Sequence, residues 1–227
     1  NRKVSSSCGS ADVLEALGVN IDLSPERVCS VVEETGIGFL FAPAFHPVMR
    51  HAAAPRKELG FSTVFNLLGP LLSPAGAPAR LCGVYSPGLV DRFSIVLQQL
   101  GTERAMVVHG QGLDEITVSG PTIVAEIDGG TIRRYTLSPE EFGIPRSPHS
   151  SLAGRSPRDN AEIIRMVLSG APGPAHDVVV LNAGAAILLG DKAPDLEQGV
   201  LKAEEAIASG AASERLEALI QASGSRE

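Results

Sequence analysis

Two adjacent carboxylates, Asp114 and Glu115, are the residues of this sequence whose types and spacing best suit a metal ion. They follow a predicted strand over 104–108, in a glycine-containing loop at the carboxyl end of that strand. Ligands of open α/β sheets bind at this end of the strands. Carboxylate oxygens are hard ligands for Mg²⁺, which keeps part of its water and bridges a phosphate-bearing substrate. The alternative is a solvated acidic loop, since charged side chains are mostly exposed.

The first eighteen residues form a candidate site for a phosphate or a diphosphate. A polar, serine-rich run over 1–7 leads into a helix that we expect to be capped by Ser10 and to end at Gly18. Unpaired amides at such a helix start, preceded by small hydroxyl side chains, suit a bound phosphate. The alternative is a flexible terminus with a helix cap behind it, because chain termini are commonly disordered.

A predicted helical stretch over 43–60 carries the basic candidates. They are His46, Arg50, His51, Arg56 and Lys57. The planar guanidinium of Arg56 could pair with a carboxylate through two parallel hydrogen bonds. A solvated helix face is the alternative, because arginine and lysine are usually exposed.

His109 stands at the end of the strand that precedes the acidic pair. With Asp114 and a serine it invites comparison with a hydrolytic triad, but the sequence has no Gly-x-Ser-x-Gly nucleophile elbow. We therefore reject the triad, and a strand-end histidine without a chemical role is the alternative.

The elements that must position these residues alternate between strands and helices. Strands over 81–85 and 104–108 flank a helix over 88–100, an order that favours parallel pairing. Further strands are expected at 116–119, 122–127 and 131–137, and 37–41 is expected as a buried strand or a tight entry into the next segment. Further helices are expected at 24–36, 159–169, 176–190, 195–208 and 211–222. We therefore predict an α/β fold with a mixed, mainly parallel central sheet flanked by helices.

The composition of the 227 residues excludes several classes of protein. A hydrophobic content of 44% with 24 glycines and 16 prolines fits an α/β enzyme domain. The net charge of −7 gives no basic surface for a nucleic-acid backbone. No apolar run approaches the roughly 20 residues that a membrane span needs. Three scattered cysteines match neither a zinc site nor a disulfide framework, so we expect a reducing cytoplasm.

Taken in order, the motifs of this chain resemble those of anthranilate phosphoribosyltransferases, which share the nucleoside phosphorylase-like fold. The matching stretches are Asn-Arg-x-Val-Ser-Ser at 1–6, Gly-Ser-Ala-Asp-Val-Leu-Glu-Ala-Leu-Gly at 9–18, Gly-Ile-Gly-Phe-Leu-Phe-Ala-Pro at 36–43, His-Pro-x-Met at 46–49, Phe-Asn-Leu-Leu-Gly-Pro-Leu at 65–71, Gly-Val-Tyr-Ser-Pro at 83–87 and Val-Val-His-Gly-x-Gly-Leu-Asp-Glu at 107–115. Similarity over 160–170 and 181–186 extends the resemblance nearly to the C-terminus. Each stretch alone is weakly specific, but seven in this order are highly specific.

The resemblance implies an enzyme of L-tryptophan biosynthesis. In this family the amine of anthranilate attacks C1 of phosphoribosyl diphosphate and gives N-(5-phosphoribosyl)anthranilate and diphosphate. By resemblance, Asn1 contacts both substrates and Arg56 holds the carboxylate of anthranilate, while Mg²⁺ binds to Asp114 and Glu115. The residues that the resemblance places around phosphoribosyl diphosphate are Asn1, Arg2, Lys3, Val4, Ser5, Ser6 and Ser10.

The sequence offers no residue that we assign as catalytic acid, base or nucleophile, and the chemistry explains why. An aniline-type nitrogen is unprotonated at neutral pH, so its attack needs no strong general base. The site has to align two substrates and stabilise the charge that develops on the diphosphate, which a metal ion helps to neutralise.

The resemblance also predicts how the chain divides into domains. Residues 1–42 and 73–227 would form the large α/β catalytic domain, and 43–72 would belong to a small α-helical domain through which family members form homodimers. The family's Gly-Thr-Gly-Gly-Asp loop, and the Lys-His-Gly that normally precedes Asn1, do not occur in the sequence. We therefore expect an N-terminally truncated enzyme that folds but does not turn over on its own.

Two other interpretations of the motifs stay open. Pyrimidine nucleoside phosphorylases share the architecture and a related phosphate site, but they need no metal-binding pair such as Asp114 and Glu115. A non-catalytic family member that binds a nucleic acid or a partner protein is the second alternative. It is disfavoured by the acidic net charge and by the presence of Arg56 together with the acidic pair.

Overall fold

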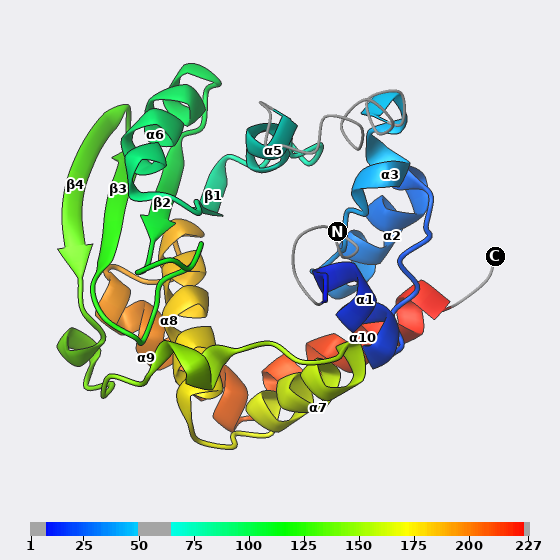
Figure 1. The fold of residues 1–227 in the computed structure, drawn as a ribbon. Helices are drawn as coiled ribbons and strands as arrows, with labels where there is room; N and C mark the ends of the chain where they lie inside the picture. The colour runs from blue at the N-terminus through cyan, green and yellow to red at the C-terminus, as the bar shows by residue number, and fades with distance from the viewer. Residues whose placement is uncertain (1–7, 50–64, 225–227) are drawn as a thin grey trace. The chain divides into compact units, whose positions relative to one another are not determined.

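The computed structural model of the chain describes residues 8–49 and 65–224, which group into two compact units (Figure 1). Of the described residues, unit 1 comprises 8–49, 65–69, 154–169 and 209–224, and unit 2 comprises 70–153 and 170–208. The contacts group residues 8–42 with two later helical segments. Unit 2 holds the sheet, and unit 1 is helical.

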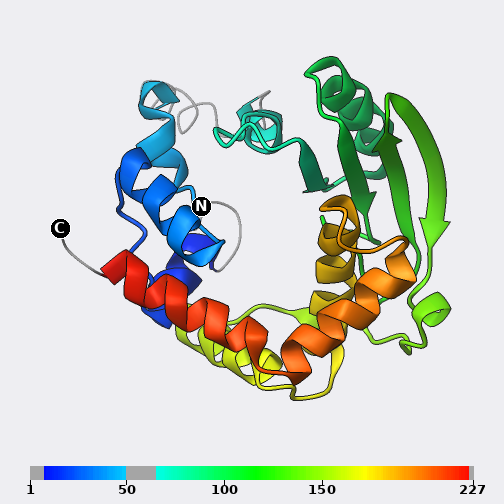
Figure 2. The ribbon, with the colours of Figure 1, turned by 180° about the vertical axis from the view of Figure 1, so that it is seen from behind.

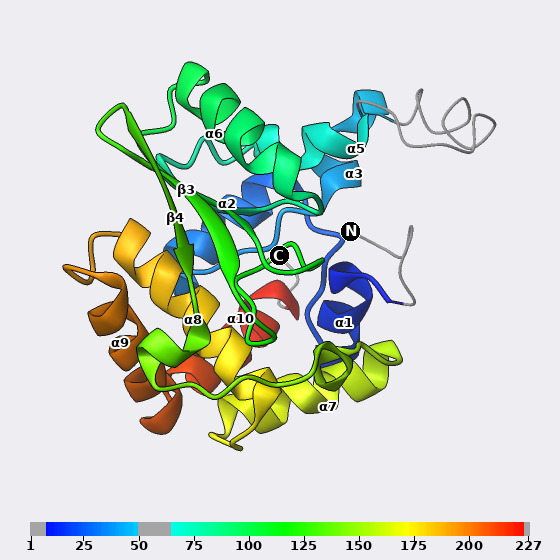
Figure 3. The same cartoon turned by 60° about the vertical axis from the view of Figure 1, so that its left-hand side comes forward.

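The four-stranded sheet of unit 2 has the spatial order β1-β2-β3-β4. Its strands are β1 (Ala79–Gly83), β2 (Arg104–His109), β3 (Thr122–Asp128) and β4 (Thr131–Leu137). β1 and β2 are parallel because the 3₁₀ turn Pro87–Leu89 and helix α6 (Val90–Gln99) carry the chain back between them. β3 and β4 form an antiparallel hairpin (Figure 3), closed by Gly129 and Gly130 at positive φ of 52° and 81°.

The predicted α/β class with a mixed sheet is confirmed, but the parallel share of the sheet is smaller than expected. β2 pairs with β1 in parallel, whereas the β2–β3 and β3–β4 pairings are antiparallel. The strand predicted at 116–119 does not form, and 37–41 leads without a strand into α3 (Ala42–Phe45), the other form expected for it. In the segment 116–119, backbone N–H groups donate to the side chains of Asn182 and Thr122 in place of a neighbouring strand.

Helices α8 (Pro174–Leu189) and α6 pack against the sheet of unit 2, and α9 (Leu196–Ala208) packs on α8 (Figures 1 and 2). α8 packs on β1 and β2 and also crosses α9, so apolar residues occur all around it. The crossing is tight at two glycines. A Cβ on Gly184 would lie 2.7 Å from the backbone nitrogen of Val200, and one on Gly199 would lie 2.4 Å from the Gly184 oxygen. Packing on two sides therefore fixes α8 against the sheet.

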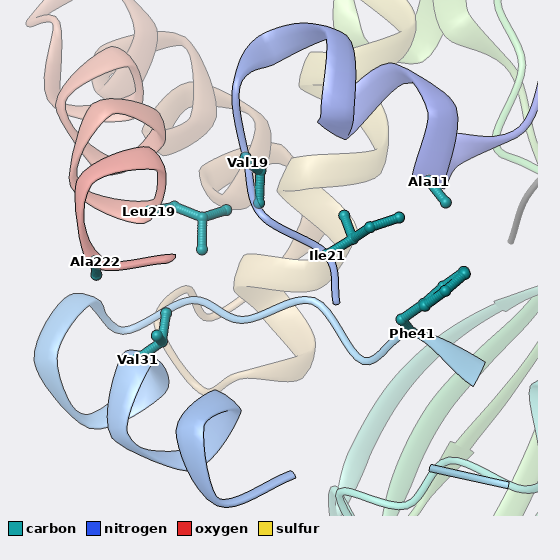
Figure 4. Packing of buried hydrophobic residues seen from close by; sticks show 7 residues of the cluster. All are labelled: Ala11, Val19, Ile21, Val31, Phe41, Leu219 and Ala222. Atoms are coloured by element: carbon teal, nitrogen blue, oxygen red, sulfur yellow. The ribbon is translucent and has the colours of Figure 1, made fainter. Parts of the chain in front are cut away.

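Unit 1 closes around an apolar cluster to which distant parts of the sequence contribute (Figure 4). Its helices are α1 (Ser10–Leu17), α2 (Pro25–Thr35), α3 (Ala42–Phe45), α5 (Phe65–Leu68), α7 (Pro157–Leu168) and α10 (Ala211–Gly224). The buried members of the cluster are Ala11, Val19, Ile21, Val31, Phe41, Leu219 and Ala222. α10 thus brings residues from the end of the sequence against α2 and the segment after α1.

Three arginines of unit 1 bind carbonyl groups at the ends of neighbouring helices. Arg165 donates to the Leu17 carbonyl at 3.1 Å, Arg215 to the Thr35 carbonyl at 3.2 Å, and Arg27 to the Ala222 carbonyl at 2.7 Å. Each carbonyl belongs to the last turn of α1, α2 or α10, where carbonyls lack a partner within the helix. A positive charge there also complements the negative end of the helix dipole.

The predicted helices of both units form with slightly different ends. α2 begins at Pro25 because the hydroxyl of Ser24 accepts the N–H of Arg27 at 3.2 Å. The helical stretch predicted over 43–60 is described only as α3 and the 3₁₀ turn Pro47–Met49, since residues 50–64 lie outside the described part of the chain. None of the helices within 8–49 and 65–224 is long and apolar enough to cross a membrane.

Candidate functional site

The acidic pair follows β2 after a tight reverse turn. Gly110 donates its N–H to the carbonyl of Leu113 at 2.9 Å, and Leu113 donates back to Gly110 at 3.0 Å. Between them, Gln111 and Gly112 have positive φ of 47° and 91°, which is the backbone geometry of a type I′ turn. The turn reverses the chain, so the acidic pair returns past the ends of the strands.

Two strand-end glycines let the backbone of the acidic pair lie directly against the sheet. A Cβ on Gly83, the last residue of β1, would lie 1.6 Å from the carbonyl oxygen of Asp114. A Cβ on Gly110 would lie 2.5 Å from the carbonyl oxygen of Glu115. Any larger residue at either position would displace the loop. Gly83 and Asp114 are far apart in the sequence, and the parallel pairing of β1 with β2 brings them together.

His109 links the end of β1 to the turn through both of its ring nitrogens. Its Nδ1 lies 2.8 Å from the Val84 carbonyl oxygen, which can only accept, so Nδ1 carries the proton. The N–H of Gly112 donates to Nε2 at 3.3 Å. The imidazole is 7% exposed and engaged at both nitrogens. Its role is structural, because it holds the turn that leads to the acidic pair.

The carboxylates of the acidic pair are exposed, yet the protonation of one of them is perturbed. Nearby protein atoms displace part of the hydration of Glu115, which raises the pKa of its carboxyl, and the charge of Asp114 raises it further. Two negative charges this close together favour a bound cation, which would stabilise the ionised form of both groups.

The acidic pair fits Mg²⁺ better than it fits a metal that needs a full cage of protein ligands. Within the described residues, no group of three or more His, Cys, Asp or Glu side chains is placed to hold an ion. Mg²⁺ is commonly held by one or two carboxylates, while waters and substrate phosphates occupy its other positions. The exposure of Asp114 and Glu115 leaves room for both kinds of ligand.

Cys82, on β1, is unsuited to act as a nucleophile. It is 5% exposed, and burial raises the pKa of its thiol to about 11, a shift that Arg80 opposes and Asp114 increases. A thiol with this pKa is protonated at neutral pH and therefore unreactive.

The start of α1 differs from the predicted phosphate-binding cap. The N-cap residue is Gly9 and not Ser10: its backbone is extended, and its carbonyl accepts the N–H of Val13 at 3.2 Å. Ser10 is already helical. The carboxylate of Asp12 accepts the N–H of Gly9 at 3.0 Å, so the chain's own acid complements the positive end of the helix.

The remaining predicted substrate-binding residues lie outside the described part of the chain. They are Asn1, Arg2, Lys3, Val4, Ser5, Ser6 and Arg56. Among the described candidates, Ser10 is an exposed residue of unit 1, and Asp114 and Glu115 belong to unit 2. Within unit 2 the structure places the backbone of the acidic pair against Gly83 and gives His109 a structural contact with the preceding turn, and neither contact was expected from the sequence.

Comparison with known proteins establishes the family of the chain. Residues 1–213 match the family described as "Glycosyl transferase family, a/b domain", and the chain belongs to this family of transferases.

Within that family, the similar proteins are anthranilate phosphoribosyltransferases, and the resemblance predicted from the motifs is confirmed. The chain is 53% identical over 226 residues to the enzyme of Methanocorpusculum labreanum. The aligned region is 100% of this chain and 66% of that protein. It is 55% identical over 225 residues to the enzyme of Rubrobacter xylanophilus. The aligned region is 98% of this chain and 66% of that protein. The chain thus spans just under two thirds of the length of these relatives.

Solved structures of anthranilate phosphoribosyltransferases share the fold. The crystal structure of the Thermus thermophilus enzyme superposes with a TM-score of 0.93 at 47% identity, covering 99% of this chain and 67% of that one. The Saccharomyces cerevisiae enzyme in complex with PRPP and Mg superposes with a TM-score of 0.90 at 32% identity, covering 99% and 64%.

Proposed function

We propose that this chain supplies the α/β domain of an enzyme that transfers the 5-phosphoribosyl group of phosphoribosyl diphosphate to the amine of anthranilate. The products are N-(5-phosphoribosyl)anthranilate and diphosphate, in L-tryptophan biosynthesis. The observation that carries the proposal is the exposed pair Asp114 and Glu115 behind the tight turn, in a chain similar to anthranilate phosphoribosyltransferases over nearly its whole length. The yeast relative in complex with PRPP and Mg supports the choice of ligands.

In this proposal each group of residues holds one part of the reactants. Asp114 and Glu115 bind Mg²⁺, which when bound neutralises negative charge on the diphosphate. The polar stretch 1–6 and Ser10 bind phosphoribosyl diphosphate, and Asn1 contacts both substrates. The guanidinium of Arg56 pairs with the carboxylate of anthranilate and thereby orients its amine.

The described residues of unit 2 agree with a reaction that needs no protein base. Nε2 of His109 is already an acceptor for the N–H of Gly112, and the thiol of Cys82 is protonated. The amine of anthranilate is an unprotonated aniline-type nitrogen at neutral pH. Alignment of the two substrates and stabilisation of the leaving charge are therefore the contributions required of the protein.

The proposal extends to the assembly and location of the complete protein. Residues 1–42 and 73–227 belong to the large domain in this proposal, and 43–72 belongs to a small helical domain that forms a homodimer. The odd number and scattered positions of the three cysteines support a reducing cytoplasm.

Anthranilate fluorescence tests the proposed activity, because it disappears as anthranilate is consumed. One sample is a chimera in which the N-terminal third of the Rubrobacter xylanophilus relative precedes residues 1–227. The unmodified relative serves as positive control, and this chain alone is the third sample. We expect Mg²⁺-dependent consumption of anthranilate by the chimera and none by this chain alone. A folded chimera that leaves anthranilate unchanged, or that cleaves a pyrimidine nucleoside with inorganic phosphate, would overturn the proposal.

A further inference from the structure

One asparagine of α8 satisfies both backbone polar groups of the residue that follows the acidic pair. Oδ1 of Asn182 accepts the N–H of Ile116 at 3.0 Å, and its Nδ2 donates to the Ile116 carbonyl at 2.8 Å. Ile116 is 2% exposed, so water does not replace either bond. The side chain thus takes the place of a neighbouring strand for a single residue.

The chemistry of this contact requires the amide of asparagine. It needs one acceptor and one donor side by side, and Nδ2 has a second hydrogen that donates to the Val178 carbonyl at 2.8 Å. This third bond ties the Asn182 side chain to its own helix and fixes its direction. Aspartate lacks both donor hydrogens, and leucine, which has a similar size, lacks every polar group.

The contact of Asn182 with Ile116 ties the chain next to the acidic pair to α8, a packed helix. α8 packs on β1 and β2, and the neighbours of Asn182 at 180 and 181 are buried at 0% and 1% exposure. On the other side of the pair, the turn is held by the N–H of Gly112 on His109. The backbone of Asp114 itself lies against Gly83. The exposed carboxylates therefore project from a backbone that is held before, at and after them.

We propose that Asn182 is a positioning residue for the cation site, one that holds the backbone at Ile116 so that the carboxylates of Asp114 and Glu115 act on the same Mg²⁺. This inference rests on the proposed function, because it takes the acidic pair to be the metal site. Groups that orient metal ligands without touching the metal commonly alter metal affinity by roughly 10- to 100-fold. Asn182 acts on the two ligands through the backbone and does not contact the ion.

The test is a titration of this chain with Mg²⁺, followed through the backbone amide resonances of residues 113–116, with inorganic diphosphate present. Asn182→Leu removes the clamp, and Asn160→Leu is the matched control. Asn160 makes a similar pair of contacts in unit 1, where it accepts the N–H of Arg155 at 2.8 Å and donates to the Arg155 carbonyl at 3.4 Å. Both variants are measured well below their thermal transitions, so that a loss of global stability does not lower the affinity.

We expect Asn182→Leu to weaken Mg²⁺ binding by roughly 10-fold or more and Asn160→Leu to leave it unchanged. Equal affinity of the unmodified chain and Asn182→Leu would overturn the inference, and so would an equal loss in both variants. Failure of the metal assignment itself gives a distinguishable result. The unmodified chain then shows no Mg²⁺ response at 113–116, like the double variant Asp114→Asn with Glu115→Gln.

A measurement on the unmodified chain decides the question if Asn182→Leu does not fold. The side-chain amide resonances of Asn182 are expected to shift with the same Mg²⁺ midpoint as the backbone amides of Glu115 and Ile116. Those of Asn160 are expected to stay in place. If the Asn182 resonances are insensitive to Mg²⁺ while the backbone amides shift, the clamp does not sense the cation and the inference is wrong.

Discussion

The contacts inside unit 1 join more distant parts of the sequence than the contacts around the acidic loop of unit 2. In unit 1, arginine side chains bind helix ends across sequence separations of 148, 180 and 195 residues. In unit 2, the acidic loop is held by bonds that span 3, 25 and 66 residues. The long contacts join distant segments, whereas the shorter ones fix a few backbone atoms beside the carboxylates. Changes in unit 1 should therefore alter stability, and changes around the loop should alter cation binding.

The largest effect is expected from removing the charges of the acidic pair. The double variant Asp114→Asn with Glu115→Gln should lose the Mg²⁺ response of the amides at 113–116, because the hard anionic ligands are gone. Its free energy of unfolding should stay within about 0.5 kcal/mol of the unmodified value, since both side chains are exposed. The control is Glu33→Gln with Glu34→Gln, an adjacent and exposed acidic pair in α2 of unit 1. If the amides at 113–116 respond to Mg²⁺ equally in both double variants, the acidic pair of unit 2 is not a cation site distinct from the acidic pair of unit 1.

Gly83→Ala should disturb the same site without altering its charge. The new methyl group would meet the Asp114 carbonyl oxygen, and backbone cannot move aside as a flexible side chain can. We expect Mg²⁺ affinity to fall by roughly 10-fold and stability by about 1–3 kcal/mol. Gly88→Ala is the control, since a Cβ at Gly88 meets nothing within 4 Å. Calorimetric and chemical unfolding of both variants, beside the Mg²⁺ titration, measure the two effects, and equal behaviour of Gly83→Ala and Gly88→Ala would contradict a role of the Gly83 contact at the site.

Arg165→Met should give the opposite pattern in unit 1. It removes the bond to the Leu17 carbonyl and the ion pair with Glu217 at 2.9 Å. We expect a loss of about 1–2 kcal/mol in unfolding free energy, with unchanged Mg²⁺ affinity. Arg158→Met is the control and should change stability by less than about 0.5 kcal/mol, since the Arg158 side chain is 89% exposed. A change in Mg²⁺ affinity in Arg165→Met alone would contradict the separation of roles.

The smallest effect is a difference in thiol labelling between the units. Cys29 of unit 1 is exposed, whereas burial raises the pKa of Cys82 to about 11. Because only the thiolate reacts, iodoacetamide at pH 8 should label Cys29 and leave Cys82 unmodified. Labelling of Cys82 should appear as the pH rises toward its pKa, or at once when the chain is unfolded in urea. Peptide mapping by mass spectrometry reads out both sites, and early labelling of native Cys82 would mean that the end of β1 opens readily.

The sequence predicted the helices better than the strands, for a physical reason. Ser24 with Pro25 marks the start of α2 locally, because the cap bond lies within four residues. Ile116 shows the limit of such patterns, since the alternating segment 116–119 resembles a strand although the Ile116 backbone bonds to Asn182. At α1 the preference of serine for caps pointed to Ser10, but the carboxylate of Asp12 selects Gly9.

By itself the sequence determined the α/β class and the family, and it singled out two adjacent carboxylates as a candidate Mg²⁺ site, because these depend on local patterns and on the order of motifs. Only the tertiary structure decided how those carboxylates are held. Gly83, His109 and Asn182 come from separate segments, and each acts through a contact that exists only once the strands pair and α8 packs on them. The spacing of residues in the sequence does not predict such contacts, since they depend on where backbone atoms of distant segments meet.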